Sequence, residues 1–216
     1  MSAPFQQYLS KIASRMRHDL KGGLLTLKMG VESLDDEETL KPLLLEKAEE
    51  LVQLSDKLVL LLRMGETKRT WIGVGGLSRH ILSQVNEKFG GLEIELRLEG
   101  DEQRWFVDPD ALTYAVLELV QNSLRAGAGR LVLSLGMDDS GRGLVGLQDD
   151  GQGLREAGDE ELTRLRDFGQ SGWGRTGLGL SIVEGCALSH QGELVWHPQS
   201  DSGLLVQLAL SVSEEG

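Results

Sequence analysis

Apolar residues in the first third of the chain recur at steps of three and four, the spacing of a helix with one apolar side. The pattern predicts a helix from about Pro4 to Leu34 and another from about Leu40 to Met64, with Pro42 in the first turn of the second. Two such helices joined by a short turn form an antiparallel hairpin. The apolar sides are Ile12, Ala13, Met16, Leu20, Leu24, Leu27, Val31 and Leu34 on the first helix, and Leu44, Ala48, Leu51, Leu54, Leu58, Leu61 and Leu62 on the second.

A hairpin of two helices cannot cover both apolar sides by itself. A four-helix bundle built from two chains would cover them, so the pattern predicts a homodimer. The alternative is that the apolar sides pack on the C-terminal part of the chain. We favour the homodimer, because the C-terminal part has enough apolar residues for a core of its own.

Helical and strand patterns alternate from Trp71 onward. Helices are expected at about 77–89, 109–126 and 178–189, and strands at about 92–98, 105–107, 130–135, 143–148, 193–197 and 203–212. The chain is therefore predicted to be α+β, with a helical hairpin over residues 1–66, a linker over 67–70 and an α/β sandwich over 71–216.

Composition and charge narrow the class of protein. Hydrophobic residues make up 40% of the 216 positions, enough for a core, and the net charge of −12 argues against nucleic acid or an anionic membrane as the main partner. A local basic site for a phosphate ligand stays compatible with that charge. The single cysteine excludes a disulfide framework. No segment approaches the roughly 20 apolar residues of a membrane span, so a cytoplasmic protein, or a cytoplasmic part of a larger receptor, is expected.

The first candidate for chemistry is His18, which falls outside the apolar side of its helix and is followed by Asp19. Its imidazole is expected to face water. A neighbouring carboxylate can hold an imidazole in one tautomer and raise its basicity, which suits a nucleophile. A histidine beside an aspartate is more often simply solvated, so the second half of the chain has to decide.

The second candidate is a polar face on the helix expected at 109–126. Spacings of four and three place Glu118, Asn122 and Arg125 on that face. An amide oxygen suits Mg²⁺, a guanidinium suits phosphate, and a carboxylate can orient a water or a metal. The alternative is a solvated stripe.

The third candidate is the end of the strand expected at 143–148. Asp149 is followed by Gly151 and Gly153, which allow the backbone to pass close to a ligand. A carboxylate here can accept a hydrogen bond from an exocyclic amine such as that of adenine. An ordinary Asp-Gly turn is the alternative.

The fourth candidate is the glycine-rich stretch G-R-T-G-L-G-L, which opens the helix expected at 178–189. Amide N–H groups at such a helix start are free to bind phosphate. The stretch differs from the Walker pattern, because no Gly-Lys-Ser/Thr ends it, and from a dinucleotide fingerprint, because it does not follow a strand. Its residues of interest are Gly174, Thr176, Gly177, Leu178 and Gly179.

The order H-D-L-K-G-G-L, E-L-V-Q-N-S-L-R, D-D-G-Q-G-L and G-R-T-G-L-G-L-S-I-V resembles that of a two-component sensor histidine kinase. The resemblance covers nearly the whole chain, as a dimerisation hairpin followed by a catalytic ATP-binding domain. The last two motifs are shared with a wider superfamily of gyrase, mismatch-repair and chaperone ATPases, and the His motif on a helical hairpin selects the kinase branch.

The resemblance implies a role for each candidate residue. His18 would be the phosphoacceptor and Asp19 its acid/base partner. Asn122 and Glu118 would hold Mg²⁺, with Glu118 also catalytic, and Arg125 would meet phosphate. Asp149 would bind the adenine amine. The remaining nucleotide-binding positions would be Gly151, Gly153, Gly174, Thr176, Gly177, Leu178 and Gly179.

The implied function is ATP-dependent autophosphorylation of His18, followed by transfer to an aspartate of a response regulator. Two alternatives stay open: a phosphotransfer or adaptor protein of the same fold without ATP turnover, and a superfamily ATPase that uses nucleotide to clamp a partner. The intact nucleotide motifs favour the kinase.

Overall fold

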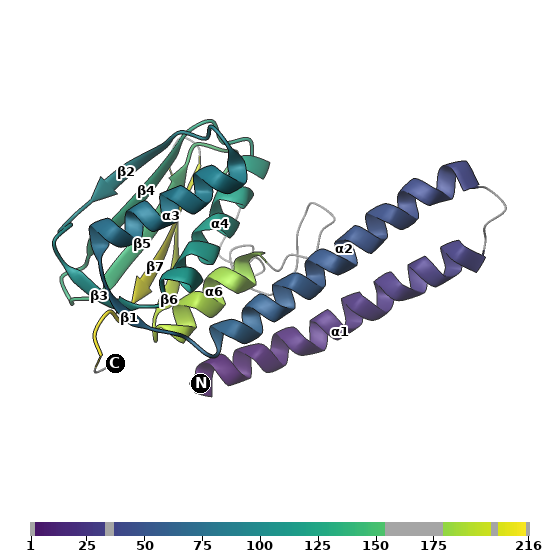
Figure 1. The fold of residues 1–216 in the computed structure, drawn as a ribbon, viewed down its shortest axis with the longest axis horizontal. Helices are drawn as coiled ribbons and strands as arrows, with labels where there is room; N and C mark the ends of the chain where they lie inside the picture. The colour runs from purple at the N-terminus through teal and green to yellow at the C-terminus, as the bar shows by residue number, and fades with distance from the viewer. Residues whose placement is uncertain (1–2, 33–36, 154–178, 200–202, 215–216) are drawn as a thin grey trace.

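The computed structural model describes residues 3–32, 37–153, 179–199 and 203–214. Helices α1 (Ala3–Glu32) and α2 (Glu37–Met64) form the predicted antiparallel hairpin, which projects from an α/β part (Figure 1). Pro42 was expected in the first turn of the second helix, but α2 begins earlier and places Pro42 in the second turn. Among the described helices, none is both long and apolar enough to cross a membrane.

Glycines in α1 allow α2 to approach closely. A Cβ atom on Gly23 would lie 2.5 Å from Cδ2 of Leu51, and a Cβ on Gly30 would collide with Leu44. Gly22, by contrast, has no atom within 4 Å of its Cβ position. The contacts at Gly23 and Gly30 define the register in which α1 and α2 pack.

The buried apolar side chains described in the hairpin gather at the end next to the α/β part. Near the α/β part, six apolar side chains are buried: Phe5, Tyr8, Ile12, Leu54, Leu61 and Met64. The alternative that the apolar sides pack on the C-terminal part is therefore correct for this end. Other large apolar side chains of the hairpin are exposed in the single chain: Leu24, Leu25, Met29, Leu43, Leu45, Val52, Val59 and Leu62.

The α/β part is a five-stranded sheet with helices on one face, which confirms the predicted α+β class (Figure 1). The strands stand in the order β2 (Ile94–Leu98), β4 (Leu131–Met137), β5 (Gly143–Asp149), β7 (Leu204–Leu210) and β6 (Glu193–Pro198). The covering helices are α3 (Val74–Phe89), α4 (Pro109–Arg125) and α6 (Gly179–Ser189). Strand β2 runs parallel to β4, and all other neighbours in the sheet are antiparallel.

The core lies between the sheet and these helices. In β4, Leu131, Leu133 and Leu135 share one face and are buried, and Val132 on the opposite face is buried too. The apolar stripe of α4 is buried as far as Val120, but Leu124 is 36% exposed because the helix ends one residue after it. The apolar pattern thus gives the core of α4 correctly except in its last turn.

A second, two-stranded sheet joins β1 (Thr70–Gly73) to β3 (Arg104–Val107). Strand β1 was not predicted. The preceding residues are also attached: the Lys68 N–H donates to the Asp108 carboxylate at 2.7 Å, and the Arg69 guanidinium donates to the carbonyl oxygens of Phe106 and Ser211. Part of the expected linker is therefore bonded to the α/β part.

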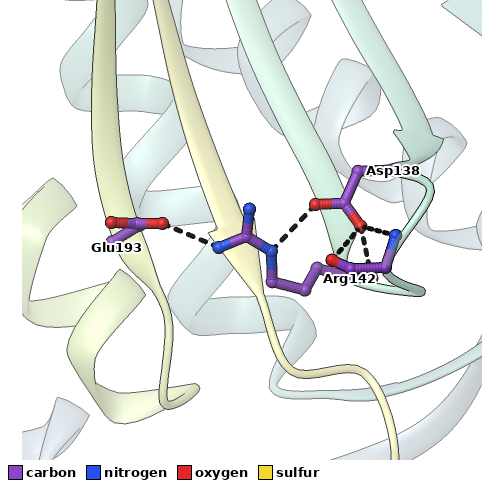
Figure 2. Close-up of polar contacts among 4 residues, drawn as sticks. Asp138, Arg142 and Glu193 are labelled. Atoms are coloured by element: carbon purple, nitrogen blue, oxygen red, sulfur yellow. Dashed lines mark hydrogen bonds and ion pairs between the residues drawn. The ribbon is translucent and has the colours of Figure 1, made fainter.

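The turn between β4 and β5 is held by one carboxylate (Figure 2). Asp138 accepts from the backbone N–H groups of Ser140 and Arg142 and from the Ser140 hydroxyl. These bonds, that of the Ser140 hydroxyl first, lower the pKa of Asp138. The Arg142 guanidinium donates to Asp138 at 2.8 Å and to Glu193 of β6 at 2.7 Å, so the turn also bridges to the edge strand.

Candidate functional site

The start of α4 is fixed by a side-chain cap. Asp108 precedes the helix, Pro109 opens it, and the Asp108 carboxylate accepts from the Ala111 N–H at 3.0 Å. An aspartate cap followed by proline is a strong helix-start signal, because both satisfy or remove unpaired N–H groups. The cap fixes the residue at which α4 begins.

Glu118 and Asn122 face the first residue of α6. A Cβ atom on Gly179 would lie 2.6 Å from Oε2 of Glu118 and within 3.7 Å of both amide atoms of Asn122. Only glycine allows this approach without a shift of the carboxylate. The structure therefore brings three of the predicted site residues together, at the N-terminus of a helix.

Arg125 follows in the last turn of α4 and is exposed. The atoms nearest to the Cβ position of Gly179 come from Glu118 and Asn122. The predicted polar face of α4 is thus divided into a buried carboxylate, a half-buried amide and an exposed guanidinium.

Asp149 ends β5 and has a donor on each carboxylate oxygen. Ser123 Oγ donates to Oδ2 at 2.7 Å, and the Gly151 N–H donates to Oδ1 at 3.0 Å. Ser123 directly follows Asn122, so one turn of α4 serves both parts of the site. Sequence reasoning missed Ser123, although its place inside the motif E-L-V-Q-N-S-L-R was available as a signal.

Glycines after β5 pack against other backbone. Gly151 is buried, and a Cβ on it would lie 3.0 Å from Cβ of Ala126. Gly153 has a φ of 62°, and a Cβ on it would lie 2.6 Å from the Gly203 carbonyl oxygen. Gly203, which sequence reasoning missed, also has a left-handed φ of 92°. The Gln152 N–H donates to the Ala126 carbonyl oxygen at 3.0 Å, which ties this loop to the end of α4.

The neighbouring Asp150 binds backbone groups before β4 rather than a residue of α4. Its carboxylate accepts from the backbone N–H groups of Arg130 and Gly129, at 2.9 and 2.8 Å, and these bonds lower its pKa. Asp150 therefore anchors the start of β4. Of the two consecutive aspartates, Asp149 is the one that points toward α4.

A lysine from the hairpin reaches the same site. Nζ of Lys57, on α2, lies 2.9 Å from Oε2 of Glu118, and the two side chains are only 17% and 9% exposed. This ion pair joins residues from the two parts of the chain. No local pattern identifies Lys57, because its partner is far away in the sequence.

His18 lies on α1 and is exposed, as its place outside the apolar side predicts. Because Gly23 faces Leu51 and Gly30 faces Leu44, the antiparallel register puts His18 level with Asp56 of α2, next to Lys57. The remaining site predictions lie outside the described part of the structure: the side chain of Asp19, and Gly174, Thr176, Gly177 and Leu178.

The oxygen atoms at the start of α6 suit a hard divalent cation. Among the described residues, no group of three or more His, Cys, Asp or Glu side chains is placed to hold a metal. Mg²⁺ needs less, because it keeps several waters and is held by one or two protein oxygens together with phosphates. The Glu118 carboxylate and the Asn122 amide fit that requirement.

The comparison with protein families agrees with this geometry. The sequence model of the histidine kinase-, DNA gyrase B- and HSP90-like ATPases matches residues 107–214, half of the chain. The matched segment contains α4, β5 and α6, which carry the site. The chain belongs to this ATPase family.

Similar proteins indicate which branch of the ATPase family the chain resembles. The sensor histidine kinase ZraS of Escherichia coli strain K12 is 24% identical over 95% of this chain, which covers 46% of ZraS. The histidine kinase AdeS of Acinetobacter baumannii has the same fold, with a TM-score of 0.63 and 18% identity over 91% of this chain and 98% of the AdeS chain. The histidine kinase domain of the E. coli osmosensor EnvZ has a TM-score of 0.50 and 27% identity over 66% of this chain and 88% of its own. The resemblance to two-component sensor histidine kinases is confirmed.

Proposed function

We propose that the protein is an ATP-dependent histidine kinase that phosphorylates itself on His18 and passes the phosphoryl group to an aspartate of a response regulator. The observation that carries the proposal is the meeting of Glu118 and Asn122 with the start of α6, in a chain whose helical hairpin exposes His18. Residues 1–66 would be the phosphoacceptor hairpin and residues 71–216 the catalytic domain, joined through 67–70.

Asp149 would bind the base of the nucleotide. Its carboxylate is oriented by Ser123 and by the Gly151 N–H, and it keeps further lone pairs for the exocyclic amine of adenine. Hydrogen bonds to an ionised acceptor are stronger than neutral ones, so this contact would contribute both affinity and selectivity for adenine.

The phosphates would lie at the start of α6, because the first backbone N–H groups of a helix have no acceptor within the helix. Glu118 and Asn122 would hold Mg²⁺, which neutralises charge on the phosphates. Gly174, Thr176, Gly177 and Leu178 precede that helix in the sequence and would complete the phosphate site together with Gly179. The exposed Arg125 would meet the phosphates from α4.

Autophosphorylation would begin when one ring nitrogen of His18 attacks the γ-phosphorus of ATP. The new N–P bond forms as the bond from phosphorus to the bridging oxygen breaks, and the electron pair leaves with ADP. Asp19 would orient the imidazole, stabilise the positive charge that develops on the ring and accept the proton from its other nitrogen. A carboxylate oxygen of the response regulator would then attack the phosphorus, and the N–P bond would break as the ring takes a proton back and leaves as neutral imidazole.

We also propose that two copies pair through the hairpin. Exposed apolar residues occur on both helices, among them Leu25 and Met29 on α1 and Leu45 on α2. Burying this surface between two hairpins forms a four-helix bundle and removes it from water.

The test is incubation of the full chain with γ-labelled ATP and Mg²⁺. We expect acid-labile, base-stable label on the wild type and none on His18→Gln. His80→Gln is the matched control, because His80 also has a carboxylate neighbour, Asp110, at 3.5 Å. It should retain the label.

The alternatives give other outcomes. A protein that binds ATP without acquiring label on His18 is a clamp-type ATPase, and one that accepts phosphate on His18 only from a phosphorylated regulator is a phosphotransfer adaptor. Either result would overturn the kinase proposal.

A further inference from the structure

Glu118 is paired across the boundary between the hairpin and the α/β part. Its carboxylate oxygen Oε2 is the atom nearest to the Cβ position of Gly179, and the same atom accepts from Lys57 Nζ at 2.9 Å. Both side chains are largely removed from water, with 17% of Lys57 and 9% of Glu118 exposed. Lys57 thus occupies the carboxylate that the proposed function assigns to Mg²⁺.

The contact is part of a wider interface with α6. Tyr8 of α1 donates its hydroxyl proton to the Ser181 carbonyl oxygen at 2.5 Å. Gly185 lies beneath the hairpin: a Cβ on it would be 3.2 Å from Cδ2 of Leu61 and 3.5 Å from the ring of Phe5. The hairpin therefore packs on the same helix whose first residue meets Glu118 (Figure 1).

We propose that Lys57 is an electrostatic lock on the nucleotide site. While the hairpin is docked on α6, the Lys57 ammonium neutralises Glu118, and a divalent cation can use this carboxylate only against the repulsion of a nearby positive charge. Binding of Mg²⁺-nucleotide and docking of the hairpin then oppose each other, and by linkage each weakens the other by the same factor.

The lock has a consequence for the order of events. Release of Lys57 from Glu118 also frees the segment of α2 that is level with His18. Binding of Mg²⁺-nucleotide is therefore coupled to release of the phosphoacceptor hairpin from α6. This inference rests on the proposed function, since it concerns the site assigned to Mg²⁺ and ATP.

The test compares lysine variants on the same helix in the full chain. Lys57→Met removes the charge and keeps the length of the side chain, and Lys57→Arg keeps the charge. Lys47→Met is the matched control, because the ion-pair partner of Lys47, Glu50 at 2.7 Å, lies on α2 itself. The measurement is the Kd of a non-hydrolysable ATP analogue, with MgCl₂ and with EDTA.

With MgCl₂, we expect Lys57→Met to bind the analogue at least about fivefold more tightly than the wild type, in the range of typical couplings between sites. Lys57→Arg and Lys47→Met should stay within about twofold of the wild type. The tighter binding by Lys57→Met should disappear in EDTA, because Lys57 competes with Mg²⁺ for the Glu118 carboxylate.

A second variant disturbs the same interface and leaves Lys57 unchanged. Gly185→Leu inserts a side chain against Leu61 and should separate the hairpin from α6. If the lock requires docking, Gly185→Leu and Lys57→Met give similar gains that do not add in the double variant. Additive gains would overturn the proposal.

Three further outcomes decide the matter. Wild-type binding that depends on Mg²⁺ but is unchanged in Lys57→Met overturns the lock and leaves the proposed function intact. Weaker binding by Lys57→Met also overturns it and makes Lys57 a phosphate ligand. Absence of analogue binding by every variant overturns the lock and the proposed function together.

Discussion

The hydroxyl of Ser123 donates to the Asp149 carboxylate at 2.7 Å and thereby connects the middle of the site on α4 to the end of β5. Asn122 and Ser123 are consecutive, so the residue proposed for the metal and the residue that orients Asp149 belong to the same turn of α4. This turn provides a direct structural coupling between the two halves of the proposed nucleotide site.

This coupling predicts graded losses of nucleotide affinity. Asp149→Asn removes a charged acceptor, whose hydrogen bonds contribute about 1.5–3 kcal/mol, and should weaken binding of an ATP analogue roughly tenfold or more. Ser123→Ala leaves the carboxylate present but less oriented and should cost a few-fold. Both are measured by titration calorimetry. Asp139→Asn, an exposed acidic residue in the turn at the other end of β5, is the control and should bind as the wild type does.

Two glycine-to-alanine changes should shift stability in opposite directions. Gly22 is exposed within α1 with free space around it, so Gly22→Ala should raise the free energy of unfolding by about 0.5–1 kcal/mol. Gly153 combines a left-handed backbone with a close carbonyl oxygen, so Gly153→Ala should lower it by roughly 1–2 kcal/mol or more. Urea unfolding measures both, and equal effects would contradict this account of Gly153.

His190 is a buried, neutral link between α6 and α4. Its Nε2 accepts from the Asp108 N–H at 2.9 Å, which leaves Nδ1 to donate to the Cys186 carbonyl oxygen at 2.8 Å. Burial, and after it the nearby charge of Arg69, lowers the pKa of His190 below 6.5. Protonation would turn Nε2 into a donor facing another donor, so the native state resists it.

The lowered pKa predicts acid sensitivity with a definite sign. Between the lowered pKa and 6.5 the unfolded chain binds more protons than the folded chain, so the contribution of His190 is complete above pH 6.5 and is lost as the pH falls. The slope for one proton is at most about 1.4 kcal/mol per pH unit. Unfolding curves from pH 7.5 to 5 should show this loss in the wild type and in His80→Gln, and a smaller loss in His190→Gln.

The exposed apolar surface of the hairpin predicts a dimer that charge can dissociate. Leu25→Glu combined with Met29→Glu would place carboxylates in the proposed bundle and should convert the dimer to a monomer in light scattering. Tyr114→Glu, a change at a similarly exposed position on α4, should leave the dimer intact. A wild type that is monomeric at micromolar concentration would contradict the pairing.

Local patterns were sufficient for most elements. The hairpin follows from steps of three and four, and the start of α4 follows from Asp108 and Pro109, because these signals act within one or two turns. Elements defined by distant partners were missed. Strand β1 exists because Thr70–Gly73 pairs with β3, and its four residues carry too little alternation to be recognised alone.

The residues of the candidate site also fall into those that local sequence patterns predict and those that depend on distant contacts. Glu118, Asn122 and Asp149 stand in motifs and could be selected, whereas their convergence on Gly179 depends on the packing of α6 against α4. Lys57 could not be selected, because an ion pair across 61 positions leaves no periodic trace. The sequence also presented packing on a second hairpin and packing on the C-terminal part as alternatives. In the structure, apolar residues near the α/β part are buried, whereas others along the hairpin are exposed in the single chain.

The hydrogen bonds of Lys68 and Arg69 leave a very short tether between α2 and the α/β part. Three residues lie between Met64, the end of α2, and the anchored Lys68, so even fully extended the segment lets these two residues separate by at most about 14 Å. So short a tether lets the α/β part pivot about the base of the hairpin but keeps it from moving along the hairpin. Under the proposed function, the histidine that is phosphorylated lies on the arc of that pivot, and the length of α2 between the tether and that histidine sets the radius.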